Sequence, residues 1–147
     1  MFSFIKNIFK GTLHKACEKG NIKAVKQHLV GGAEGPNNLR SLVNAEDGLG
    51  FTPLLWAAAK DRKEIAELLI AKGADVNVKK EDGWTPLHSA ASFDYKEIAE
   101  LLIAKGADVN TIDVDGKTPL DYAEGEIADL LRKHGGKTGE ELKAEGK

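Results

Sequence analysis

The stretch KEIAELLIAKGADVN occupies residues 63–77 and recurs, letter for letter, at residues 96–110. An identical copy 33 positions away indicates a structural element used twice, because a catalytic group is seldom needed in duplicate. Within the copy, Ile98, Leu101 and Leu102 have the i, i+3, i+4 spacing of one helical face. The stretch therefore predicts the same amphipathic helix at two places in the chain.

The 33-residue period extends beyond the copied stretch. Thr-Pro-Leu begins at residues 52, 85 and 118, and Val-Asn lies nine residues before each threonine. Threonine is a good helix N-cap and proline fits the first helical position, so each Thr-Pro-Leu predicts the start of a helix. Each repeat is therefore expected to contain a first helix, a turn, a second helix that ends at a glycine such as Gly106, and a projecting turn.

TPLHSAA at Thr85–Ala91, followed by IAELLIAKGADVN and the 33-residue period, strongly resembles the ankyrin repeat. The resemblance covers residues 12–136. It implies an all-α fold, an ankyrin-repeat solenoid of stacked helix-turn-helix units with projecting β-turn or hairpin loops. One unit cannot bury its own apolar face, so neighbouring units must stack to build a core. The repeat helices are expected to begin near residues 12, 52, 85 and 118.

Both ends of the chain depart from the repeat. Residues 1–11 have apolar residues at helical spacing and are expected to form an N-terminal amphipathic cap. Residues 137–147 form a C-terminal tail. Thr138 and Glu141 have the spacing of a capping box, but a frayed tail is the favoured interpretation because only Leu142 is available to be buried.

Two irregularities lie inside the array. Residues 34–42 form an insertion, in which Asn38 is expected to cap one helical turn that carries Arg40. The insertion is either a tolerated surface loop or a partner-binding loop. In the last repeat, Ile127 lies seven positions after Leu120, against eleven positions at the matching place in the two repeats before it. Its first helix is therefore expected to be clipped.

Composition argues against several functional classes. The chain has 147 residues, of which 41% are hydrophobic and 30% charged, and its net charge of −2 includes no basic stripe for nucleic acid. Its single cysteine cannot form an intrachain disulfide, which fits a reducing cytoplasm. No run of 18 apolar residues is present to span a bilayer. We expect a cytoplasmic monomer that does not bind nucleic acid.

No arrangement of residues in the sequence predicts catalysis. The resemblance implies a structural role for His88, whose ring would bond backbone groups of adjoining turns. Cys17 aligns with Ala58 and Ala91 and is expected to be a small core residue. Metal-ligand spacings, phosphate-binding loops and a G-x-S-x-G motif do not occur. We therefore expect no enzymatic activity, cofactor, metal or small-molecule substrate.

The resemblance implies that the projecting turns and first helices form a concave face that holds a protein partner. These positions differ between repeats whose second helices are identical. With one residue from the insertion, the candidate partner-binding residues are Arg40, Leu49, Phe51, Trp56, Lys60, Glu81, Asp82, Trp84, Phe93, Val114, Asp115 and Lys117.

The four aromatic candidates and Leu49 are expected to form a cluster, since aromatic residues are preferred anchors at interfaces. Aromatic rings in this region could instead fill space between helices, an interpretation that suits Trp56 and also Tyr122, which is not among the candidates. For Phe51 and Trp84, each next to a turn glycine, binding is the favoured role.

The sequence thus predicts a non-catalytic scaffold that binds an unidentified protein partner. The alternative is a membrane-peripheral adaptor anchored by residues 1–11. A chain without a partner, produced by design or reconstruction, is a third possibility. The insertion, the clipped last repeat and the irregular first repeat argue against that third possibility.

Overall fold

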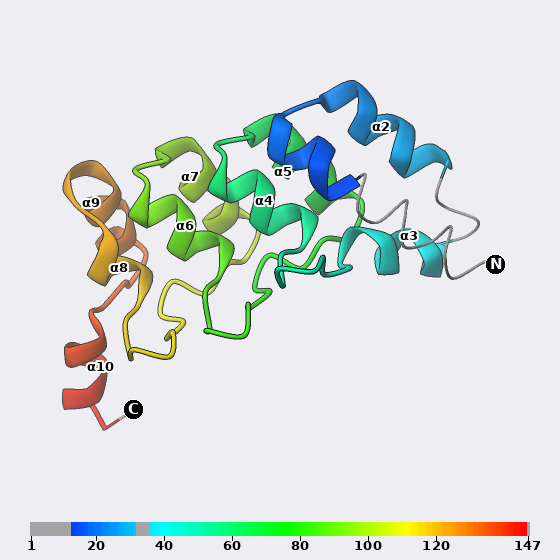
Figure 1. Ribbon diagram of the computed structural model, residues 1–147. Helices are drawn as coiled ribbons and strands as arrows, with labels where there is room; N and C mark the ends of the chain where they lie inside the picture. Colours follow the sequence, from blue (N-terminus) through cyan, green and yellow to red (C-terminus); the bar gives the residue numbers. More distant parts are fainter. Residues whose placement is uncertain (1–12, 32–35, 147) are drawn as a thin grey trace. The chain divides into compact units, whose positions relative to one another are not determined.

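The computed structural model describes residues 13–31 and 36–146, which consist of α-helices, turns and loops without a β-strand (Figure 1). The chain divides into two compact units, Met1–Asp75 and Val76–Lys147. Within the described ranges, every helix is too short or too polar to cross a bilayer. The cap expected at residues 1–11, on which the membrane-adaptor alternative depends, lies outside the described residues and stays a prediction.

The described residues of the first unit form five helical segments. A helix over 13–19 is followed by α2 (Ile22–Gly31), α3 (Pro36–Val43), α4 (Pro53–Ala59) and α5 (Lys63–Ala71). Helix α4 packs on α5, and α5 also contacts α2. The core of this unit consists of apolar side chains that are fully or almost fully buried, among them Leu13, Cys17, Val25, Val43, Leu54, Leu55, Ile65 and Leu69.

The second unit contains two further helix pairs and a terminal helix. Its elements are α6 (Pro86–Ser92), α7 (Lys96–Ala104), α8 (Pro119–Tyr122), α9 (Gly125–Lys133) and α10 (Gly139–Ala144). Figure 1 shows α6 beside α7, with the loops before α6 and α8 projecting from one side of this unit. Its buried apolar side chains are Leu87, Ala90, Ala91, Ile98, Ala99, Leu102, Leu120, Ile127, Leu131 and Leu142.

The Thr-Pro-Leu motifs start helices as predicted. Helices α4, α6 and α8 begin at the three prolines. Thr52 Oγ1 accepts the N–H of Leu55 at 3.3 Å, and Thr85 Oγ1 accepts the N–H of His88 at 3.3 Å. These hydroxyls satisfy backbone donors that a helix N-terminus leaves without an intrahelical partner.

The duplicated stretch forms the same helix twice, as α5 and α7, with identical bounds within the copy. The buried face differs by one position from the predicted face. In α7 it consists of Ile98, Ala99 and Leu102, whereas Leu101 is only half-buried. The prediction that Leu101 lies in the buried face is therefore wrong. Small Ala99 faces the core instead, which permits close helix packing.

The recurring Val-Asn pairs have a structural explanation, because each asparagine side chain forms hydrogen bonds with the backbone just after a later helix, beginning at the glycine that follows it. The side-chain amide donates to the glycine carbonyl at 2.9–3.1 Å and accepts the N–H two residues farther on at 2.8 Å. The three bridges join Asn44 to Gly73 and Asp75, Asn77 to Gly106 and Asp108, and Asn110 to Gly135 and Lys137.

The tail is helical, and the favoured interpretation of a frayed end is wrong. Helix α10 follows the capping box of Thr138 and Glu141, and Leu142 is buried. Arg132 donates to both carboxylate oxygens of Glu141, at 2.7 and 2.8 Å, and these hydrogen bonds lower the pKa of Glu141 to about 2. One buried leucine and one bidentate ion pair hold the short helix in place.

The insertion also contains more helix than expected. Helix α3 begins at Pro36, two residues before the predicted cap at Asn38, because proline suits a first helical position. Val43 is fully buried, whereas Arg40 is exposed. Residues 34–35, the start of the predicted insertion, lie outside the described residues.

Candidate functional site

The two projecting turns of the second unit are hydrogen-bonded to each other. The carbonyl of Asp82 accepts the N–H of Val114 at 2.9 Å. Gly83 has φ +79°, and a Cβ built on it would lie 2.8 Å from the Cα of Asp113. This close approach requires glycine at position 83. The turn tips that carry Glu81, Asp82 and Val114 are thus fixed relative to each other.

Trp84 is a packed residue as well as a surface residue. Its side chain is half-buried, and Nε1 donates to Ser89 Oγ at 2.7 Å. Its ring is stacked with the ring of His88 at a centroid distance of 5.1 Å and meets the Tyr122 ring edge-on at 5.0 Å. These contacts make part of the Trp84 ring unavailable to a partner. The sequence did not predict this stack.

Asp113 organises the last projecting turn. Its carboxylate accepts a 2.5 Å hydrogen bond from the Tyr122 hydroxyl and the N–H groups of Asp115 and Lys117 at 2.9 and 3.0 Å. Burial opposes ionisation of Asp113, but these hydrogen bonds outweigh it and lower its pKa. Burial and the adjacent carboxylate both raise the pKa of Tyr122. Lys117 completes the group, with Nζ 5.7 Å from the centroid of the Tyr122 ring.

The first unit contains the same arrangement around Asp47. Trp56 Nε1 donates to Asp47 Oδ2 at 2.6 Å, and Asp47 Oδ1 accepts the N–H groups of Leu49 and Phe51 at 2.9 and 3.0 Å. The Phe51 ring stacks on Trp56 with centroids 4.3 Å apart. Burial opposes ionisation of Asp47, yet the hydrogen bonds from Trp56 and the turn lower its pKa.

The sequence reasoning missed Asp47 and Asp113, although a signal was present. In both repeats an aspartate lies nine residues before an aromatic side chain that can donate a hydrogen bond. The middle repeat has a lysine and Ser89 at these two positions. There Trp84 reaches Ser89 from within the turn, so the hydrogen bond is kept by different residues.

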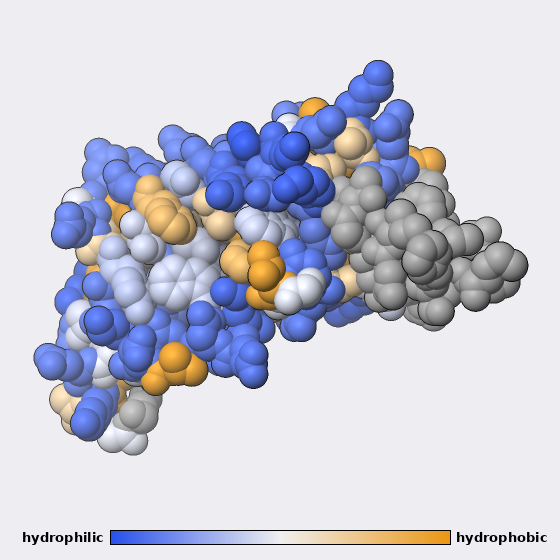
Figure 2. All heavy atoms as spheres, in the orientation of Figure 1, coloured by the Kyte–Doolittle hydropathy of each residue, from blue (hydrophilic) through white to orange (hydrophobic). Residues whose placement is uncertain are grey.

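The remaining candidates are more exposed. Leu49 is 69% exposed, Val114 71% and Phe93 54%, and on the face in Figure 2 hydrophobic residues stand out singly among hydrophilic ones. Phe93 is the C-cap of α6, whereas Trp84 precedes the helix. The centroid of the Phe93 ring lies 5.8 Å from that of the Tyr95 ring. Within the second unit, the expected aromatic cluster is therefore split between the two ends of α6.

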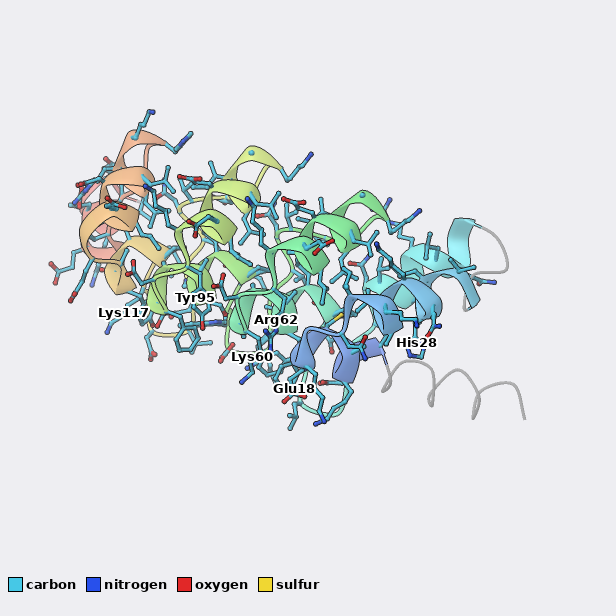
Figure 3. The ribbon with its side chains drawn as sticks, turned by 90° about the horizontal axis from the view of Figure 1, so that it is seen from above. Glu18, His28, Lys60, Arg62, Tyr95 and Lys117 are labelled. Atoms are coloured by element: carbon cyan, nitrogen blue, oxygen red, sulfur yellow. The ribbon has the colours of Figure 1, made fainter. Side chains whose placement is uncertain are left out.

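The charged candidates lie at the surface of their elements. Lys60 is the C-cap of α4 and is exposed, close to Arg62, whose guanidinium donates to the carbonyl of Glu18 at 3.3 Å (Figure 3). Side chains from both units share this exposure: Arg40, Lys60, Glu81, Asp82, Asp115 and Lys117. Exposed charges of this kind favour recognition and steering of a charged partner.

The expected structural roles of His88 and Cys17 are confirmed. His88 Nε2 lies 3.1 Å from the carbonyl of Lys117, and His14 Nε2 lies 2.6 Å from that of Ala45. Cys17 is fully buried, and burial raises the pKa of its thiol to about 12. Across residues 13–31 and 36–146, no group of three or more His, Cys, Asp or Glu side chains could hold a metal ion.

We expect Tyr122→Phe to lower the free energy of unfolding by about 0.5–1.5 kcal/mol, because one partly solvated hydrogen bond to Asp113 is lost. Tyr95→Phe is the matched control, since no hydrogen bond of its hydroxyl is seen in the described residues. Urea denaturation of both variants measures the difference. Equal stability of the two variants would show that the Tyr122–Asp113 hydrogen bond contributes nothing.

Comparison with known proteins places these features in a family. Residues 54–103 match the family model "Ankyrin repeats (many copies)". A putative ankyrin repeat protein of Rickettsia bellii is 36% identical over 63 residues, which cover 43% of this chain and 36% of that protein. Human scaffold protein ILK is 37% identical over 62 residues, covering 42% of this chain and 12% of ILK.

A third relative has an enzymatic name. Palmitoyltransferase AKR1 of Naumovozyma castellii is 37% identical over 72 residues, covering 49% of this chain and 9% of that protein. The chain therefore spans about a third or less of these relatives, and the shared stretch is the repeat rather than the whole of a scaffold or a transferase. The stretch matched by the family model runs through the helix pairs that follow Thr52 and Thr85, so this part of the chain, residues 54–103, consists of ankyrin repeats.

Proposed function

We propose that the chain is a non-catalytic interaction module that holds a protein partner on its turn tips and first helices, the face expected from the sequence to be concave. The observation that carries the proposal is a contrast within the two turns that contain Asp47 and Asp113. Hydrogen bonds between the aspartates and the aromatic side chains hold the backbone of each of these turns in place. Leu49 and Val114 at the turn tips are nevertheless 69% and 71% exposed.

Rigid turns favour binding for an energetic reason. A loop that is already ordered loses little conformational entropy when a partner docks, so more of the contact energy contributes to affinity. Single exposed apolar residues are common on protein surfaces, and neither Leu49 nor Val114 indicates a site alone. Their position on hydrogen-bonded turns, together with the protein-interaction role supported by the family and the scaffold relative, supports the proposal.

A triple variant tests the proposed surface. We expect Leu49→Gln, Phe93→Gln and Val114→Gln, combined in one chain, to reduce partner capture from a lysate of the source cells by roughly tenfold or more. All three side chains are mainly exposed, so thermal unfolding should be unchanged. Val30→Gln is the matched control, because Val30 is an 82% exposed residue of α2 outside the turns.

Quantitative mass spectrometry of the captured proteins gives the readout. A partner that the wild type and Val30→Gln retain but the triple variant loses would support the proposal. A partner captured equally by all three chains would remove the turn tips from the site. Alanine at Phe51 or Trp84 is a poorer test, because both rings are stacked and their loss would also change stability.

A further inference from the structure

The clipped first helix of the last repeat leaves a groove beside α6. Helix α8 has four residues, whereas α4 and α6 each have seven. Helices α6 and α8 pack together, but α8 ends at Tyr122 and the chain turns into α9 at Gly125. The groove has a volume of about 590 Å³ and is lined by Ala91, Ser92, Asp94, Tyr122, Glu124, Gly125 and Glu126.

The missing residues explain the groove. In the two preceding repeats the first isoleucine of the second helix lies eleven positions after the leucine of Thr-Pro-Leu, but Ile127 lies only seven positions after Leu120. The four residues removed correspond to about one helical turn. The last turn of α6, which carries Ala91 and Ser92, therefore faces the groove rather than a full-length helix.

The groove is acidic. Three of its seven lining residues are carboxylates, and all three side chains are exposed. Lys96 Nζ pairs with Glu126 at 3.1 Å. Asp94 and Glu124 form no hydrogen bond or ion pair within the described residues. The surrounding unit, Val76–Lys147, has ten Lys and Arg against fifteen Asp and Glu, a net charge of −5.

Aromatic rings lie at the groove and beside it. Tyr122 is part of the lining, and Phe93 and Tyr95 flank Asp94 in the chain with their rings 5.8 Å apart. Carboxylates next to aromatic rings suit a guanidinium group, which is planar, donates several hydrogen bonds and stacks on aromatic faces. A metal ion would need converging ligands, and among the described residues the carboxylates do not converge in that way.

We propose that this acidic groove receives an arginine side chain of the protein partner, an inference that rests on the proposed interaction function. The volume lies within the range of roughly 300–1,000 Å³ that is usual for small-ligand sites. The unpaired carboxylates of Asp94 and Glu124 attract the positive charge. The α6 turn and Tyr122 provide walls for the aliphatic part of the side chain.

A defined probe tests the groove without knowledge of the partner. The full chain, labelled with ¹⁵N, is titrated with N-acetyl-arginine methylamide and, separately, with the neutral N-acetyl-citrulline methylamide. We expect chemical shift changes that saturate and centre on the backbone amides of Ser92, Asp94 and Gly125 with arginine only. Changes spread over all acidic residues, equal changes with citrulline, or no change would each overturn the proposal.

A pair of charge-matched variants sharpens the test. Asp94→Asn with Glu124→Gln is expected to weaken binding of the arginine probe by roughly fivefold or more, because two attractive charges are removed. Glu100→Gln with Asp129→Asn changes the net charge equally at exposed residues outside the groove lining and should leave binding unchanged. Equal weakening by both pairs would show that the probe senses only net charge.

The outcomes for the groove and for the proposed function are separable. If the Asp94→Asn, Glu124→Gln chain captures the partner as well as the wild type does, the groove does not hold the partner's arginine, and the turn tips can still be the binding surface. If the triple variant of Leu49, Phe93 and Val114 retains its partner and the groove variant loses it, the groove binds and the turn tips do not. Each result decides one proposal independently of the other.

Discussion

Leu102→Ala is expected to lower the free energy of unfolding by about 2–5 kcal/mol, the range for leucine removed from a well-packed core. Leu102 is fully buried in α7, and alanine would leave a cavity that the surrounding helices fill only in part. Leu101→Ala is the control, since Leu101 is only half-buried in the same helix and should cost about 1–2 kcal/mol. Urea denaturation followed by circular dichroism measures both values.

The duplication provides a second, sequence-matched measurement. Leu69 is the counterpart of Leu102 in the copied stretch and is also fully buried, but it belongs to the first unit. Leu69→Ala is therefore expected to have a similar cost, again about 2–5 kcal/mol.

If Leu101→Ala destabilised the chain as much as Leu102→Ala, the buried face of α7 would have to include Leu101, against the structure.

Much of the fold could be predicted because local signals recur. Thr-Pro-Leu identified the starts of α4, α6 and α8, and the copied stretch identified α5 and α7. The shortened spacing between Leu120 and Ile127 identified the clipped helix α8. These signals depend on cap and spacing rules that act within one or two helical turns.

Two of the errors, in the tail and in α7, concern contacts that the local sequence does not specify. Helix α10 depends on Arg132, which pairs with Glu141 across nine positions. Neither residue alone indicates that the tail is held. The buried face of α7 depends on what its neighbours supply, and hydrophobicity alone did not distinguish small Ala99 from larger Leu101.

The candidate site was predictable in its positions but not in its exposure. Leu49 and Val114 lie on turn tips and are exposed, and their binding role stays a prediction. Trp84 has the same kind of position next to a turn glycine, yet its ring packs against His88 and Tyr122. The exposure of an aromatic ring is set by the residues that surround it in three dimensions, and a single sequence does not specify those neighbours.

His88→Ala is expected to lower the free energy of unfolding by about 2–4 kcal/mol, because it removes a buried ring and several hydrogen bonds together. Nδ1 of His88 accepts the N–H of Thr85 at 3.2 Å and lies 2.8 Å from its hydroxyl. Nε2 donates to the carbonyl of Lys117 at 3.1 Å. His134→Ala is the control, an exposed histidine whose replacement should change stability by less than about 0.5 kcal/mol.

The same histidine makes stability depend on pH. Burial lowers the pKa of His88 below its ordinary 6.5, although the hydrogen bond to Lys117 and the carboxylates of Asp113 and Asp82 partly oppose that shift. The unfolded chain therefore binds a proton at His88 more readily than the folded chain. The stabilisation is complete above pH 6.5 and is lost as the pH falls toward the folded-state pKa.

Urea denaturation at about pH 7.5 and about pH 5 tests this dependence, because the unfolded His88 takes up a proton more readily than the folded His88 between these values. The wild type should be less stable at the lower pH, and the difference should shrink in His88→Gln. Glutamine keeps a donor and an acceptor but cannot take up a proton in this range. If the pH dependence were the same in both chains, it would come from other titrating groups, and protonation of His88 would not be what weakens the cap of α6 in acid.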